Sequence, residues 1–153
     1  MRRVSVGDFR IGDGERVAIM NVLDSGRISE GEKVREFEKE FAKFIGTKYA
    51  IAVSSGSSAL LGGLSALIHR SEINIKQNTN VITAPLTYIA TSSMIVKAGL
   101  NPVYVDVDST SFCITPGNIK SHLETVDDIE GYSLVLPVHL MGSACNGISK
   151  IRN

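Results

Sequence analysis

The sequence lacks any long apolar run and any excess of charge of one sign. No apolar stretch approaches the ~20 residues that a membrane-spanning helix needs, and the opening segment, Met1–Ser5, lacks the apolar core of a secretory signal. The 16 basic and 16 acidic side chains cancel, so nothing in the charge balance points to nucleic acid or an anionic membrane as a partner. These absences predict a cytoplasmic protein that binds neither.

Cysteine and histidine are also scarce. The two cysteines, Cys113 and Cys145, are too few and too widely spaced for a disulfide framework. The histidines show no i, i+4 pairing with one another or with a cysteine, so no zinc site is predicted at His69, His122 or His139. We expect both cysteines to be reduced and to pack as small apolar residues.

The remaining composition is that of an ordinary globular chain, and we expect residues 1–153 to form a single domain with its own core. Short β-rich runs alternate with helical stretches, a pattern typical of a parallel sheet covered by helices. The sequence therefore predicts an α/β fold, with an open, mostly parallel sheet and helices on both faces.

The predicted elements follow from periodicity and from turn residues. Helices are expected over residues 14–23, 34–45, 59–68, 88–98 and 116–123. Strands are expected over residues 48–53, 80–84, 102–105 and 133–138. The clearest helix carries one apolar stripe, formed by Val34, Phe37, Phe41, Phe44 and Ile45. A partner surface is possible there, but core packing is the interpretation that we prefer.

Ligands of open α/β sheets bind outside the carboxyl ends of the strands, so the loops after Val53, Ala84 and Val138 matter most. The first loop, residues 54–58, leads directly into a helix, whose first N–H groups attract phosphate. Gly56 would permit close approach of the backbone to a phosphate. Simple N-capping by serine explains this stretch equally well.

The other two loops each offer one side chain. Tyr88 follows the second predicted strand and is suited to stacking on a planar ring. His139 follows the last strand and can titrate near neutral pH. Taken alone, each is better explained as structural: a tyrosine at a domain edge, and a histidine without a catalytic partner.

Five sequence segments, taken together, favour a functional explanation of these loops over a structural one. They span residues 25–42, 50–60, 83–91, 99–108 and 137–142. In their order and spacing they resemble the DegT-type sugar aminotransferases, over almost the whole chain. The resemblance implies the aspartate-aminotransferase fold, with this chain forming an incomplete large domain of a fold-type I pyridoxal-phosphate (PLP) transferase. It also implies a reaction that moves an amino group, commonly from glutamate, onto a nucleotide-linked keto-sugar in polysaccharide or amino-sugar biosynthesis.

The resemblance also assigns roles to the three loops. By position, Gly56, Ser57 and Ser58 would cradle the cofactor phosphate. Tyr88 would stack on the pyridine ring, and His139 would lie near the cofactor.

By the same resemblance, Arg27 and Ser29 would lie near the substrate opening.

Other parts of the family pattern are changed or absent. Ser57 replaces the usual threonine, and residues 69–80 and 145–146 depart from the family pattern. The lysine that forms the Schiff base would lie beyond Asn153, so we expect no catalytic residue within the chain and no activity from the chain alone.

Three hypotheses remain open. The first is a split or truncated aminotransferase, completed by a downstream chain or acting within a homodimer. The second is part of a PLP-dependent sugar dehydratase. The third is a non-catalytic module that keeps the fold for dimerisation or ligand binding.

Overall fold

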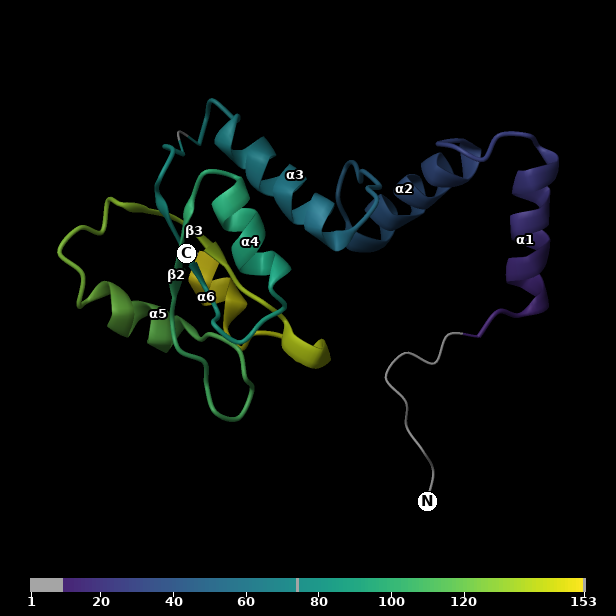
Figure 1. Cartoon of the computed structure of the whole chain (residues 1–153). Helices are drawn as coiled ribbons and strands as arrows, with labels where there is room; N and C mark the ends of the chain where they lie inside the picture. Colours follow the sequence, from purple (N-terminus) through teal and green to yellow (C-terminus); the bar gives the residue numbers. More distant parts are fainter. Residues whose placement is uncertain (1–9, 74, 153) are drawn as a thin grey trace, which may run out of the picture. The chain divides into compact units, whose positions relative to one another are not determined.

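The computed structural model describes residues 10–73 and 75–152, so the opening segment Met1–Ser5 lies outside the described residues. The chain divides into two compact units, residues 1–52 and 53–153 (Figure 1). The single domain expected from the sequence stays a prediction, and the two units are described separately below.

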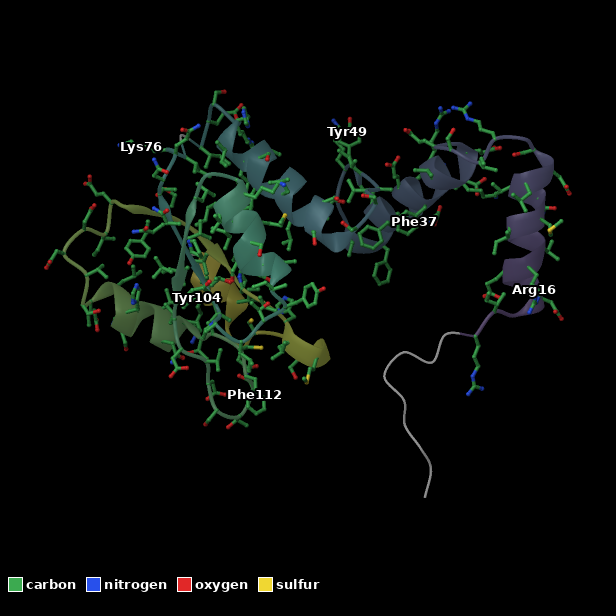
Figure 2. The ribbon with its side chains drawn as sticks, viewed as in Figure 1. Arg16, Phe37, Tyr49, Lys76, Tyr104 and Phe112 are labelled. Atoms are coloured by element: carbon green, nitrogen blue, oxygen red, sulfur yellow. The ribbon has the colours of Figure 1, made fainter. Side chains whose placement is uncertain are left out.

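The first unit contains α1 (Asp13–Asp24) and α2 (Glu32–Ile45), close to the two helices that the sequence predicts. Gly46 ends α2 in the left-handed conformation, with φ of 79°. Phe37 projects from α2 (Figure 2), and its ring centroid lies 5.6 Å from that of Phe41. Phe44 is 84% exposed, so the expected packing of this stripe in a core is wrong. The described part of the first unit supplies no further element to cover it.

The strand expected at residues 48–53 is also absent, and Ile51 is 83% exposed rather than buried. A strand exists only through its ladder of hydrogen bonds to a neighbour, and no described segment pairs with this one. The segment is instead tied to α2 by a hydrogen bond of 2.8 Å from the Ala52 N–H to the Glu38 carboxylate. The sheet therefore has three strands among the described residues, not the four expected.

The second unit is built on this sheet of parallel strands, ordered β2-β1-β3. The strands are β1 (Asn80–Thr83), β2 (Asn101–Tyr104) and β3 (Tyr132–Leu136). In the central strand, Val81, Ile82 and Thr83 are fully buried, as expected for a parallel strand covered on both faces.

Helices cover both faces of the sheet, which confirms the predicted fold class. They are α3 (Gly56–Ile68), α4 (Ala90–Lys97), α5 (Pro116–Leu123) and α6 (Ile148–Arg152). One core cluster joins Val81 to α3 and α4, and a second joins Ile82 to α5 and α6. The chain passes from β1 to β2 over one face and returns to β3 over the other, as right-handed crossovers require.

Two short elements near the end were not predicted. A single 3-10 turn covers Leu140–Gly142, and α6 has only five residues. Such lengths are too short to show a helical period in the sequence. Among the described residues, no helix has the length and apolarity needed to cross a membrane.

Candidate functional site

The neighbouring parallel strands β1 and β3 have their carboxyl ends at the same edge of the sheet. The chain leaving β1 runs to α4 on one face of the sheet, whereas the chain leaving β3 runs to α6 on the other, so the two loops diverge where these neighbouring strands end. The hydroxyl of Thr83 donates a hydrogen bond of 2.9 Å to the carbonyl of Leu136 and fixes the two strand ends together. The loops carrying Tyr88 and His139 start from this edge.

A cavity of about 660 Å³ lies where the start of α3 meets the start of α4. Its lining residues are Ser55, Gly56, Ser57, Ala59, Leu60, Tyr88, Ala90 and Thr91. The structure thus brings Gly56 and Ser57 together with Tyr88, although about thirty residues separate them in sequence. The packing of α3 on α4, both of which cover the same face of the sheet, produces this convergence.

The start of α3 supports both interpretations of its serine-rich loop. Ser55 caps the helix, since its hydroxyl oxygen accepts a hydrogen bond of 3.1 Å from the Ser58 N–H. The N–H groups of Gly56 and Ser57 find no acceptor within the described part of the chain. A Cβ added to Gly56 would meet nothing within 4 Å. Two unpaired amides therefore lie at the positive end of a helix, and the space beside Gly56 is open.

The Ser58 hydroxyl belongs to the same capping cluster. It lies 3.2 Å from the Ser54 hydroxyl and 3.1 Å from that of Ser55. Because its amide is already bonded to the cap, Ser58 holds the loop in shape rather than offering a free N–H group.

Removing the cap gives a direct measure of this role. We expect Ser55→Ala to lower the free energy of unfolding by about 1 kcal/mol, because the Ser58 N–H loses its partner. Urea unfolding followed by circular dichroism measures the change. Ser57→Ala is the matched control: its hydroxyl makes no hydrogen bond among the described residues, so a change below about 0.5 kcal/mol is expected. Equal losses in both variants would show that the capping bond is not what holds the loop.

Tyr88 lies at the rim of the cavity with its side chain 78% exposed. Its carbonyl accepts a hydrogen bond of 3.0 Å from the Thr91 N–H, at the start of α4. The hydroxyls of Thr87 and Thr91 lie 2.9 Å apart and further fix this turn. The backbone at Tyr88 is therefore held while the ring stays available for stacking. Sequence reasoning missed Thr91, although its i, i+4 spacing from Thr87 was a usable signal.

His139 follows β3 but does not line this cavity. Its Nδ1 accepts a hydrogen bond of 2.9 Å from the Cys145 N–H. In the neutral ring the proton must therefore sit on Nε2, which has no partner among the residues described. The structure places this N–H donor at the end of the strand beside β1, apart from the group formed by Gly56, Ser57 and Tyr88.

Arg27 and Ser29 belong to the first unit, where they line a separate cavity of about 780 Å³. The Nε of Arg27 donates a hydrogen bond of 2.9 Å to the carbonyl of Glu30. The side chain is therefore held against its own loop, and its remaining guanidinium N–H groups can serve as donors.

Two further features limit the chemistry of the cavity in the second unit. No lysine is among its lining residues. Within the described residues there is also no cluster of three side chains suited to holding a metal ion. The cavity offers two unpaired amides and an aromatic face, and no lysine among its lining residues.

Comparison with known proteins identifies the family of this chain. The model described as the DegT/DnrJ/EryC1/StrS aminotransferase family matches residues 10–153. The chain belongs to this family. The spore coat polysaccharide biosynthesis protein SpsC of Bacillus subtilis is 36% identical over 136 residues, covering 89% of this chain and 32% of SpsC. This confirms the resemblance found in the sequence.

Solved structures agree on the fold. The E. coli GDP-4-keto-6-deoxy-D-mannose-3-dehydratase with bound hydrated PLP has a TM-score of 0.80 and 33% identity, covering 95% of this chain and 36% of the other. The aminotransferase from Psychrobacter cryohalolentis has a TM-score of 0.78 and 33% identity, covering 94% and 34%. The chain thus spans about a third of the length of the relatives that it matches.

Proposed function

We propose that this chain contributes the cofactor phosphate site of a PLP-dependent sugar aminotransferase. The observation that carries the proposal is the cavity at the start of α3, which joins two unpaired amides to the exposed ring of Tyr88. An anion site beside an aromatic face suits a phosphorylated, planar cofactor. The bound PLP of the related E. coli structure supports this choice of ligand.

The residues of the cavity fit the cofactor. The Gly56 and Ser57 N–H groups, with the Ser57 hydroxyl, hold the phosphate, and Ser58 holds the capped loop in shape. Tyr88 stacks on the pyridine ring, and the Nε2–H of His139 is a donor at the neighbouring strand end. When bound, the cofactor supplies an electron sink for charge that develops on the amino-group donor. The chain's own residues bind and orient it.

The substrate part of the proposal rests on the family. The substrate is a nucleotide-linked keto-sugar, used with an amino donor in polysaccharide or amino-sugar biosynthesis. The name of SpsC supports the polysaccharide setting. Arg27 and Ser29 are the residues proposed to lie near the substrate. The Arg27 guanidinium suits a nucleotide-linked sugar because it binds phosphate groups well.

The amine that would carry the cofactor is proposed to lie after Asn153. None of the cavity's lining residues is a lysine, and the chain spans about a third of its relatives' length. On this proposal the chain alone does not transaminate. We propose that a complementing downstream chain supplies the rest of the enzyme, or that the chain acts within a homodimer.

Two other candidates keep the same fold. The likeness to the E. coli dehydratase favours a PLP-dependent sugar dehydratase as the second candidate, and the same cavity would serve it. A non-catalytic module would keep the sheet but need not bind cofactor.

Titration with PLP and with pyridoxal, followed by absorbance, tests the proposal. We expect reversible binding of PLP, displacement by inorganic phosphate, and binding of pyridoxal at least about tenfold weaker, since charge-assisted hydrogen bonds contribute about 1.5–3 kcal/mol. Equal binding of PLP and pyridoxal would contradict a phosphate site. If neither compound bound, the non-catalytic module would become the preferred function of the chain.

A further inference from the structure

Both cysteines lie in the second unit, and the backbone N–H of one of them, Cys145, bonds to His139. Cys113 precedes α5, Cys145 precedes α6, and both side chains are buried. The Cys113 Sγ lies 3.6 Å from the carbonyl oxygen of Ser143, two residues before Cys145. The Cys145 Sγ lies 3.2 Å from the carbonyl oxygen of Val138. Two buried thiols from segments far apart in sequence thus both contact carbonyl oxygens of the segment 138–145.

The backbone beside each thiol has an unusual conformation. Phe112, directly before Cys113, has φ of 56°, and Met141, in the turn before Cys145, has φ of 51°. Both are non-glycine residues in the left-handed region, which is unfavourable for a bulky side chain. Both side chains are exposed, so packing does not explain these conformations. The pair is therefore flanked by two residues with strained backbone.

We propose that Cys113 and Cys145 form a reversible dithiol–disulfide pair that controls the position of His139. The oxidant is a low-molecular-weight disulfide such as oxidised glutathione. One cysteine thiolate attacks a sulfur of that disulfide and releases the first small thiol. The other cysteine thiolate then attacks the mixed disulfide and releases the second. The S–S bond of the oxidant is replaced by one between the two cysteines, and two electrons and two protons leave in the small thiols.

His139 links this pair to the carboxyl end of the sheet. The Cys145 N–H holds Nδ1 of His139 at 2.9 Å, and the Cys145 thiol is itself turned towards the Val138 carbonyl. A disulfide draws the Cys145 sulfur towards Cys113 and turns the backbone that carries this N–H. The ring then loses the partner that fixes its proton on Nε2. The redox step does not depend on the proposed function. Its effect on catalysis, through His139, does rest on the proposed function.

Burial makes this step slow rather than impossible. Burial, followed by the neighbouring Cys113 thiol, raises the pKa of the Cys145 thiol. Less thiolate is present near pH 7, and the thiolate is the reacting form. Residues 141–144 and 146–150 around Cys145 are exposed, so local opening of this segment gives access to the pair. We therefore expect oxidation over minutes to hours, the range of uncatalysed disulfide exchange.

The test uses the full chain in glutathione buffers of increasing oxidised fraction, quenched with acid and alkylated. Intact mass and non-reducing peptide mapping identify the products. We expect loss of two hydrogens, a single Cys113–Cys145 cross-link, and full reversal by reduced glutathione. Cys113→Ala and Cys145→Ala are the matched variants, each checked by circular dichroism for folding. Each lacks the second thiol and is expected to form no internal disulfide and to stop at the mixed disulfide.

A second readout follows the histidine ring by nitrogen chemical shifts, without any cofactor. We expect the His139 signals to change on oxidation, whereas His69 and His122 serve as internal references. The proposal is overturned if the folded chain keeps two alkylatable thiols in the most oxidising buffer, or if a cross-link forms and leaves the His139 signals unchanged. Either result is independent of whether the chain binds PLP.

Discussion

Ile95→Ala is expected to lower the free energy of unfolding of the second unit by about 2–5 kcal/mol. Ile95 is fully buried on α4 and packs in the cluster with Leu64 of α3 and Val81 of the central strand. Truncating it removes apolar contacts on the face that also positions the cavity, and leaves a void between three elements. Urea unfolding followed by circular dichroism measures the loss.

Val96→Ala is the matched control, because Val96 is the next residue on α4 and is 60% exposed. A change within about 0.5 kcal/mol is expected for an exposed position. Should the two variants prove equally stable, α4 would not pack on the sheet as described. The cavity between α3 and α4 would then lose its structural basis.

Gly56→Ala is expected to weaken PLP binding by about 10–100-fold without harming the fold. A Cβ at Gly56 meets nothing within 4 Å of the protein, so the added methyl group points into open space. That space is next to the two unpaired amides, where the methyl group would hinder close approach of a phosphate. Losing charge-assisted hydrogen bonds of about 1.5–3 kcal/mol gives the expected factor. The measurement is the same absorbance titration, made on wild type and variant together.

Gly62→Ala provides the matched control on the same helix. Its Cβ also meets nothing within 4 Å, but Gly62 does not line the cavity. Alanine there should raise stability by about 0.5–1 kcal/mol through helix propensity and leave PLP binding unchanged. If both glycine variants bound PLP like the wild type, the phosphate would not sit at the start of α3.

The ring of Tyr88 can be tested by the same titration. Tyr88→Phe keeps the aromatic face and should bind PLP within about twofold of wild type. Tyr88→Ala should bind about 3–10-fold more weakly, because aromatic stacking contributes about 0.5–1.5 kcal/mol. If Tyr88→Ala bound PLP as tightly as Tyr88→Phe, Tyr88 would not be part of the cofactor site. Because the ring is exposed at the cavity rim, neither substitution is expected to disturb folding.

Local signals in the sequence were sufficient for most helices. Pro116 opens α5 at the predicted residue, and Gly46 ends α2 because its positive φ suits glycine. Both features are decided by the residue itself and its immediate neighbours. The same holds for the cap at Ser55, which the serine-rich loop already suggested.

Features that depend on distant partners were not predictable in the same way. Residues 48–53 have a strand-like sequence, but no described neighbour completes their ladder. The meeting of Gly56 with Tyr88 followed only from the family resemblance and from the general rule for strand ends. The bond between Cys145 and His139 left no sequence signal, because it depends on the conformation of the turn between them.

The most direct test is borohydride reduction of the chain saturated with PLP, followed by peptide mapping of every lysine. We expect the cofactor to remain removable, with no single lysine labelled in stoichiometric yield, because no lysine lines the cavity proposed to hold it. Stoichiometric labelling of one specific lysine would contradict this view of the chain as a cofactor site completed from elsewhere. That residue would then be the missing amine, and the chain would be an enzyme in its own right.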